Sequence, residues 1–280
     1  MSEELDIEEA QEIANSLDIK EGIGLESGQK DVFLAHEGDK EVVAKFLLIE
    51  NQELYKRGKR ELEAMEKIEC DYFVDLLDFS EVQHEGLTYF VFVEEFIEGR
   101  TLREALNDGE RFDEDKAKDL CKRLMTAVKE FHNHKYIHRD IKPENIMLSP
   151  ERGPMLLDAG IIKFEERTNI TPTHRSSAPG TYNYSAPEQL ENEQILQSVR
   201  TDIFSSGIVV FESLTGENPF DIGDRAIPEV IKSGDQSRIT DAIGDSISKE
   251  FCEVILKMTK KEPYNRPVGP EKVLEDLSDV

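Results

Sequence analysis

The sequence lacks several features that would define its class at once. It has no tryptophan, and its three cysteines, Cys70, Cys121 and Cys252, are scattered without a Cys-x-x-Cys pair. An odd and dispersed set argues against a disulfide framework or a zinc site. No stretch approaches the roughly 20 apolar residues of a membrane span, and the start, MSEE, lacks the basic and apolar regions of a signal peptide. We therefore expect a soluble, cytoplasmic protein.

Basic residues are also scarce relative to acidic ones. The chain has 34 Lys and Arg against 60 Asp and Glu, which gives a formal net charge of −26. A surface this acidic repels nucleic acid and anionic lipid. We expect neither nucleic acid nor a membrane as a partner, and the same charge would steer basic peptides toward the protein.

The acidic N-terminal segment, residues 1–21, predicts a helical extension. Ala10, Ile13, Ala14 and Leu17 follow the spacing i, i+3, i+4, i+7, which indicates one apolar face of a helix. We expect this helix to pack on the domain that follows it rather than bind a partner.

Residues 22–278 predict an α+β fold in two lobes. Short β-prone runs and one main helix over 51–68 fill the part up to about residue 96, and amphipathic helices dominate from residue 99. A small antiparallel-sheet lobe followed by a larger helical lobe leaves a crossing segment at about 95–99. A cleft between two such lobes is a usual place for a nucleotide.

The most informative segment is residues 137–145, IHRDIKPEN. Asp140 precedes Asn145 by five residues, and Lys142 lies two residues after the acid. In a phosphoryl-transfer site a carboxylate meets the attacking hydroxyl, a lysine steadies the moving phosphoryl group and an amide oxygen holds a metal. The segment provides all three groups.

This segment resembles the catalytic loop of eukaryotic-type serine/threonine protein kinases, and the order of elements is similar to that family over nearly the whole chain. The resemblance implies transfer of the γ-phosphoryl group of ATP to a protein hydroxyl, with Mg²⁺ or, in its place, Mn²⁺. Asp140 would orient the hydroxyl and accept its proton, and Lys142 would contact the phosphate. Asn145 and Asp158, which offer hard oxygen ligands, would bind the metal.

The resemblance also assigns the residues around ATP. Lys45, which ends the run VVAK, would contact the α- and β-phosphates, and Glu61 would pair with it from the helix over 51–68. Glu63 is the alternative partner, but residues two apart on a helix point about 200° apart, so only one of the two faces the cleft. Adenine would meet the backbone of Ile97 and lie between Val32, Ala44 and Met147, and the remaining implied contacts are Gly28 and Glu95.

The sequence departs from the family pattern at three places around this site. The glycine-rich loop pattern falls on residues 25–32, LESGQKDV, where one glycine survives and Glu26 and Lys30 replace two others. Because glycine lets backbone N–H groups approach phosphate, this loop indicates weaker or altered ATP binding. Ala159 stands where the family has phenylalanine. Glu94 falls at the gatekeeper position, where a buried carboxylate needs a partner or a proton, unless the alignment slips by one residue.

Further landmarks concern the fold and its regulation. Glu188, in the segment SAPE, resembles the acid that closes the activation loop and is expected to pair with Arg266. Asp202 resembles the helix acid that braces the catalytic loop, and Thr181 would lie near that loop. Arg139 would bind a phosphate group on the activation loop. The candidate phosphosites are Thr168, Thr171, Thr173, Ser176 and Ser177.

Two other functions stay open at this point. A pseudokinase, which is a nucleotide-binding or scaffolding module without turnover, is favoured by the altered glycine loop, by Ala159 and by Glu94. A small-molecule phosphotransferase on a related fold would share the acid and the asparagine, but would not be expected to carry Lys142 together with SAPE and Thr181. The complete set of catalytic side chains favours an active serine/threonine protein kinase.

Overall fold

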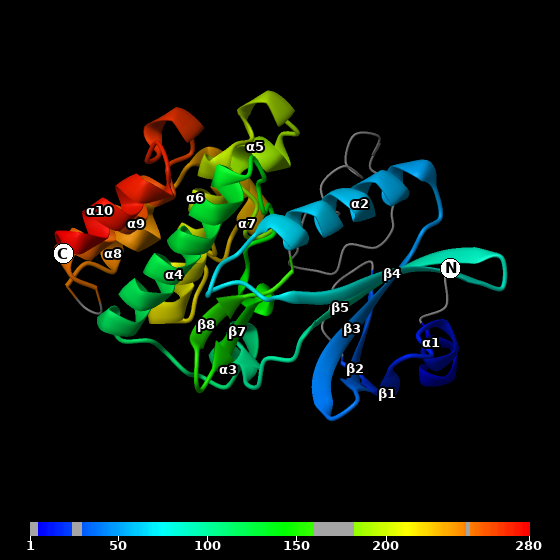
Figure 1. The fold of residues 1–280 in the computed structure, drawn as a ribbon. Helices are drawn as coiled ribbons and strands as arrows, with labels where there is room; N and C mark the ends of the chain where they lie inside the picture. Colours follow the sequence, from blue (N-terminus) through cyan, green and yellow to red (C-terminus); the bar gives the residue numbers. More distant parts are fainter. Residues whose placement is uncertain (1–4, 24–29, 159–181, 245–246) are drawn as a thin grey trace.

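The computed structural model describes residues 5–23, 30–158, 182–244 and 247–280, which form two lobes joined by one crossing segment (Figure 1). An antiparallel sheet lies at one end of the molecule, and most of the helices gather at the other end. The predicted α+β fold, with the sheet first and the helices second, is confirmed.

Within the described residues, the first lobe contains one sheet of five antiparallel strands. Their order across the sheet is β1, β2, β3, β5, β4. The bounds are Asp18–Gly22 for β1, Asp31–Glu37 for β2, Lys40–Leu48 for β3, Leu76–His84 for β4 and Leu87–Glu95 for β5. The two β-prone runs after residue 30 are therefore the hairpin of β2 and β3 in the middle of the sheet.

Strand register divides the side chains of this sheet between two faces. In an antiparallel pair, directly opposed residues share a face, and neighbours along one strand alternate between faces. Val32, Lys45 and Phe92 are opposed across β2, β3 and β5, and they share the inner face, which joins the core of the helical lobe. Ala44 is opposed to Val93, and both lie on the outer face.

Helix α1, Ile7–Ile13, packs against the outer face (Figure 1). Asp6 starts the helix with a capping box, in which its side chain accepts the backbone N–H of Glu9 at 2.9 Å. Ala10 is fully buried among the apolar side chains of the outer face. The helix thus packs on the domain as expected, but strand β1 starts ahead of residue 22, where the domain was expected to begin.

Helix α2, Gln52–Lys67, lies against the inner face and carries an acid to it. Asn51 caps its start by accepting a backbone N–H group. A Cβ atom at Gly58 would lie 2.5 Å from the ring of Phe90, so only glycine lets the helix approach the sheet this closely. Glu61, one turn further along the same helix face, is 1% exposed.

The helical lobe is built around α6, Val199–Thr215, whose side chains are buried along almost its whole length. The long helix α4, Glu114–Asn133, packs beside it. The other helices of the described chain are α3 Leu102–Asn107, α5 Pro187–Leu190, α7 Ile227–Ser233, α8 Ser237–Asp241, α9 Lys249–Met258 and α10 Pro270–Ser278, with 3₁₀ turns at Pro143–Asn145, Gln194–Leu196 and Pro263–Asn265. None of the helices in the described ranges is both long and apolar enough to cross a membrane.

A second, small sheet lies between the crossing segment and the helices. Its strands β6, Arg100–Thr101, β7, Ile146–Ser149, and β8, Gly153–Leu156, are antiparallel and adjacent in that order. Asn145 immediately precedes β7, and Asp158 follows β8 after one intervening residue. The β7–β8 hairpin therefore brings these two predicted metal ligands back toward each other.

Candidate active site

The catalytic loop, residues 138–145, is held in place by the central helix α6. Asp202, 1% exposed, accepts hydrogen bonds from the backbone N–H groups of His138, at 2.9 Å, and of Arg139, at 2.7 Å. Arg139 has a φ of 68°, a left-handed conformation that is unfavourable for a residue with a side chain and that these bonds help to maintain. Burial raises the pKa of Asp202, while His138 and the two N–H groups oppose the shift. Asp202 thus takes the bracing position expected from the sequence.

The side chains of this loop converge on Asp140. Nδ2 of Asn145 donates to the backbone carbonyl and to Oδ2 of Asp140, each at 2.8 Å, and Nζ of Lys142 lies 3.5 Å from the same Oδ2. The two bonds fix the direction of the Asn145 amide, because they turn its nitrogen toward Asp140 and leave its oxygen as a ligand atom. Acid, lysine and amide are therefore in contact with one another, as the motif predicts.

Asp158 lies beside this loop at the end of the β7–β8 hairpin. The backbone N–H of Leu157 donates to the carbonyl of Asn145 at 2.8 Å, and Asp158, with a φ of 56°, is 7% exposed. The oxygens of Asn145 and Asp158 are hard ligands, and Mg²⁺ takes its other ligands from water and substrate phosphates. The donor set therefore fits Mg-ATP. Among the described residues, no group of three or more His, Cys, Asp or Glu side chains could hold a metal.

The ion pair predicted between Lys45 and Glu61 is wrong for this structure. Nζ of Lys45 lies 2.7 Å from Oε2 of Glu94, and both side chains are buried. Glu61 pairs instead with Lys30, whose Nζ lies 2.5 Å from Oε1 of Glu61 and 3.4 Å from Oδ1 of Asp158. The reason is the sheet register: Glu94 lies diagonally across from Lys45 on the same inner face and offers it a carboxylate.

The same pairs bear on two points left by the sequence. Glu94 is 2% exposed and pairs with Lys45, so this buried carboxylate has the partner that its burial requires. Glu61 faces the sheet, whereas Glu63 is exposed and pairs with Lys67 on the same helix. The choice of Glu61 over Glu63 is thereby supported, although its partner is a different lysine.

The ammonium groups of Lys30 and Lys45 and the carboxylates of Glu61, Glu94 and Asp158 form one buried cluster of charges. Burial raises the pKa of Glu61 to about 8; Lys30 opposes the shift and Asp158 adds to it. Burial also works against the charge of Lys30, but the carboxylates of Asp158 and Glu61 outweigh it and raise the pKa of that ammonium group. With Lys45 and Glu94 included, the carboxylates exceed the ammonium groups by one.

Two of the residues predicted to contact adenine, Val32 and Ala44, lie on opposite faces of the sheet. Val32, 5% exposed, lies opposite Lys45 on the inner face, where a nucleotide ring between the lobes could reach it. Ala44 lies on the outer face, fully buried against the side of the sheet that α1 covers, so its assignment to adenine is wrong. Val43 lies on the inner face in its place, because it is two residues from Lys45 on the same strand.

At Glu95 and Ile97 in the crossing segment, only backbone groups are left to bind adenine, because both side chains are engaged elsewhere. The side chain of Ile97 is 6% exposed and packed in the main core. The side chain of Glu95 pairs with Arg152 at 2.6 Å, and its backbone N–H donates to the carbonyl of Asp75 at 3.0 Å. Met147 on β7 is partly buried at the edge of the same core.

The expected pair of Glu188 and Arg266 forms deep in the helical lobe. Nη1 and Nη2 of Arg266 donate to the two carboxylate oxygens of Glu188, at 2.7 and 2.8 Å, and neither side chain is more than 1% exposed. Such a two-pronged pair joins the end of the activation loop to the C-terminal part of the chain. Eight other predicted residues lie outside the described part of the chain: Gly28, Ala159, Thr168, Thr171, Thr173, Ser176, Ser177 and Thr181.

Comparison with known proteins agrees with this geometry. The model of the protein kinase domain matches residues 22–276. This chain belongs to the protein kinase family. It is 32% identical over 254 residues to the probable serine/threonine-protein kinase PknB of Lactococcus lactis and 30% identical over 256 residues to the serine/threonine-protein kinase PrkC of Bacillus subtilis. Each match covers 89% of this chain and 38% of the relative.

A third relative shows the same relation in length. The chain is 32% identical over 254 residues to the serine/threonine-protein kinase PknA of Corynebacterium glutamicum, a match that covers 88% of this chain and 53% of the relative. The chain therefore spans about half the length, or less, of these curated kinases.

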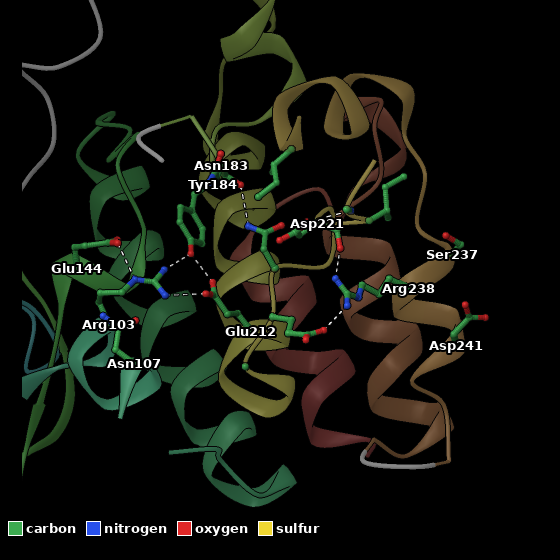
Figure 2. A pocket seen from close by; sticks show the side chains of 16 residues that line it. Arg103, Asn107, Glu144, Asn183, Tyr184, Glu212, Asp221, Ser237, Arg238 and Asp241 are labelled. Atoms are coloured by element: carbon green, nitrogen blue, oxygen red, sulfur yellow. Dashed lines mark hydrogen bonds and ion pairs between the residues drawn. The ribbon is translucent and has the colours of Figure 1, made fainter. Parts of the chain in front are cut away.

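A polar cavity of about 770 Å³ opens beside the catalytic loop of this kinase domain (Figure 2). Glu144 of the loop and Glu212 of α6 both hold Arg103 of α3, whose Nε and Nη1 lie 2.8 and 2.9 Å from their carboxylates. The hydroxyl of Tyr184 contacts both Arg103 and Glu212, and Arg238 lines the far side (Figure 2). These two acids therefore share one guanidinium group of the chain itself, which offsets one of their two negative charges.

Sequence reasoning gave no role to Lys30 or to Arg103. In the sequence pattern, Lys30 is only the replacement of a glycine. Lys30 lies two residues before Val32, which is opposed to Lys45, so strand alternation could have predicted that the Lys30 side chain points to the inner face. Arg103 and Glu212 are 109 residues apart, and no spacing rule connects them.

Proposed function

We propose that this chain is the catalytic domain of a serine/threonine protein kinase, which transfers the γ-phosphoryl group of Mg-ATP to a hydroxyl group of a protein. The observation that supports it most is the convergence of Asp140, Lys142, Asn145 and Asp158 beside one braced loop. The relatives' names support the same reaction, and the family shows the fold on which it occurs.

In this proposal each side chain acts on a separate part of the reaction. Asp140 orients the hydroxyl of the substrate and accepts its proton, and Lys142, 3.5 Å from the Asp140 carboxylate, stabilises the phosphoryl group as it moves. Asn145, through its amide oxygen, and Asp158 hold Mg²⁺, or Mn²⁺ in its place. The bound metal ion neutralises charge on the phosphates of ATP. Catalysis is then mainly positioning and charge stabilisation, for which the hydrogen bonds that the loop donates to Asp202 hold the loop in place.

Adenine would lie between the lobes in this proposal. Val32 supplies an apolar surface from the sheet and Met147 supplies one from β7, while Glu95 and Ile97 present backbone groups at the crossing segment. Val43 replaces Ala44 on the sheet side because it shares the inner face. Gly28 remains part of the proposed phosphate loop.

The proposed protein substrate is basic, and the negative charge of the domain attracts it at long range. The formal net charge of −26 favours basic peptides in the encounter step. Close to the loop, Glu144 and Glu212 already bind Arg103, so a basic substrate residue would have to compete with that side chain. We place the protein in the cytoplasm, and we propose regulation by phosphorylation of one or more of Thr168, Thr171, Thr173, Ser176 and Ser177, with Arg139 as the site that binds the phosphate group and Thr181 near the acceptor hydroxyl.

The test is phosphoryl transfer from γ-labelled ATP in the presence of Mg²⁺, with the chain alone and with a basic acceptor protein. Asp140→Asn is the inactivating variant, and Lys67→Met, on the exposed side of α2, is the control that should keep wild-type activity. Label on serine or threonine that disappears with Asp140→Asn supports the proposal. If wild type binds Mg-ATP but transfers no label to any protein, the domain is a nucleotide-binding module, and label on metabolites alone indicates a small-molecule phosphotransferase.

A further inference from the structure

The position of Lys30 is unusual because it places an ammonium group between two acids that belong to different lobes. Its Nζ lies 2.5 Å from Oε1 of Glu61 on α2 and 3.4 Å from Oδ1 of Asp158 beside the catalytic loop. The side chain is 4% exposed, and the ammonium group also lies 5.0 Å from the ring centre of Phe92. The Lys30 side chain is therefore buried between the two lobes, in contact with Glu61, Asp158 and Phe92.

This position coincides with the region that the phosphates must occupy. In the proposed function, Asp158 and Asn145 would hold the metal, which would offset the charge of the phosphates. The ammonium group of Lys30 lies at hydrogen-bonding distance from the helix acid and close to the metal-binding acid. A phosphate bound to a metal on Asp158 would therefore come next to Lys30 with little movement of the side chain.

Lys45 is engaged elsewhere. Its Nζ lies 2.7 Å from Glu94, with exposed fractions of 5% and 3% for the two side chains. To reach Glu61, Lys45 would have to leave the Glu94 carboxylate buried without its cation, which is strongly unfavourable. Glu94 is the penultimate residue of β5, next to the crossing segment, so this pair lies on the adenine side of the cleft.

We propose that Lys30, oriented by Glu61, is the lysine that binds the phosphates of ATP, and that Lys45 is a positioning residue that neutralises the gatekeeper Glu94. The inference rests on the proposed function as a Mg-ATP-dependent kinase. It also gives a physical reason for the altered glycine loop. A cation at position 30 supplies the positive charge that close backbone N–H groups would otherwise provide.

The experiment measures binding, so that turnover is not required. Calorimetric titration of the whole chain compares two probes, the non-hydrolysable analogue adenosine 5′-(β,γ-imido)triphosphate with Mg²⁺, and adenosine alone. The ratio of the two affinities isolates the contribution of the phosphates. The variants are Lys30→Met, Lys30→Gln and Lys45→Met, and the control is Lys67→Met, which removes an exposed lysine paired with another acid of α2.

We expect both Lys30 variants to lower the affinity for the triphosphate analogue roughly 10- to 100-fold and to leave adenosine binding unchanged. Lys30→Gln keeps a donor for Glu61 and thus protects the fold if Lys30→Met does not fold. Lys45→Met should change the affinities for both probes by the same factor, because its partner lies on the adenine side. Lys67→Met should match wild type.

Three results would overturn the proposal. A ratio that falls for Lys45→Met and not for the Lys30 variants would return the phosphate role to Lys45. Tighter binding of the triphosphate analogue by either Lys30 variant would show that Lys30 blocks the site. A wild-type chain that binds neither probe would overturn the proposed function along with this inference. If wild type binds both probes and the Lys30 variants show the same ratio of the two affinities as wild type, the inference alone would be overturned.

Discussion

The two lobes hold their charged residues by different means. On the helical side, the acids bind partners that cannot move far: Asp202 accepts two backbone N–H groups, and Glu188 binds the guanidinium of Arg266 with both oxygens. On the sheet side, the flexible side chains of Lys30 and Lys45 share several carboxylates. Backbone contacts therefore fix the helical side to the family pattern, whereas the pairing on the sheet side depends on which carboxylate lies nearest.

The largest effect is expected where the helical side does its chemistry. Asp140→Asn removes the proton acceptor while it preserves the shape of the side chain, so phosphoryl transfer should fall roughly 100- to 10,000-fold. Affinity for Mg-ATP should stay near the wild-type value, because metal and phosphate contacts are made by other residues. Steady-state kinetics with a binding measurement on the same samples would check this, and near-normal turnover in the variant would remove Asp140 from the mechanism.

The buried pair in the helical lobe should have the next largest effect. Glu188→Gln leaves the buried guanidinium of Arg266 without its counter-charge, and breaking such a pair costs about 3–5 kcal/mol of unfolding free energy. Urea denaturation would measure it. Lys67→Met, which breaks an exposed pair on α2, should give no measurable change, and equal effects of the two variants would mean that burial does not distinguish the two pairs.

The packing of α2 on the sheet provides a third way to separate the two sides. Gly58→Ala puts a methyl group 2.5 Å from the ring of Phe90, so the helix must shift, at a cost of about 1–3 kcal/mol. That shift would move Glu61 and weaken nucleotide binding, although alanine is the better helix former. Adding Phe90→Leu makes room and should restore part of both losses. A Gly58→Ala protein as stable as wild type would show that this close approach is not needed.

The smallest of the expected free energies is the coupling between Lys45 and Glu94 on the sheet side. Lys45→Met and Glu94→Met should each destabilise the protein, while the double variant should recover part of the loss, with a coupling free energy of about 0.5–3 kcal/mol. Urea denaturation of the four proteins in this cycle would measure it. The corresponding cycle of Lys45→Met with Glu61→Gln should give a smaller coupling free energy. A larger coupling of Lys45 with Glu61 than with Glu94 would restore the pair expected from the sequence.

The parts of the molecule that the sequence predicts well are those set by local periodicity or by a dense motif. Helix α2 follows from helical spacing, which also lets only one of Glu61 and Glu63 face inward. The contacts among Asp140, Lys142 and Asn145 lie within six residues of chain. The assignment of Ala44 to adenine came from the resemblance and did not use strand alternation, which from Lys45 already puts Ala44 on the outer face.

The exchange of lysines could not be predicted in the same way. Lys30, Glu61 and Asp158 come from three distant segments, and their meeting depends on how closely α2 approaches the sheet. Glu94 did carry a signal, because a buried carboxylate requires a cation or a proton. What the sequence left undecided was which of two lysines would supply the cation.

The most direct measurement is a crystal structure of the chain with Mg²⁺ and adenosine 5′-(β,γ-imido)triphosphate. The account predicts that Nζ of Lys30 contacts phosphate oxygens while it keeps its bond to Glu61, and that Lys45 stays paired with Glu94. A structure in which Lys45 has left Glu94 for Glu61 and the phosphates, with Lys30 turned away from them, would contradict it.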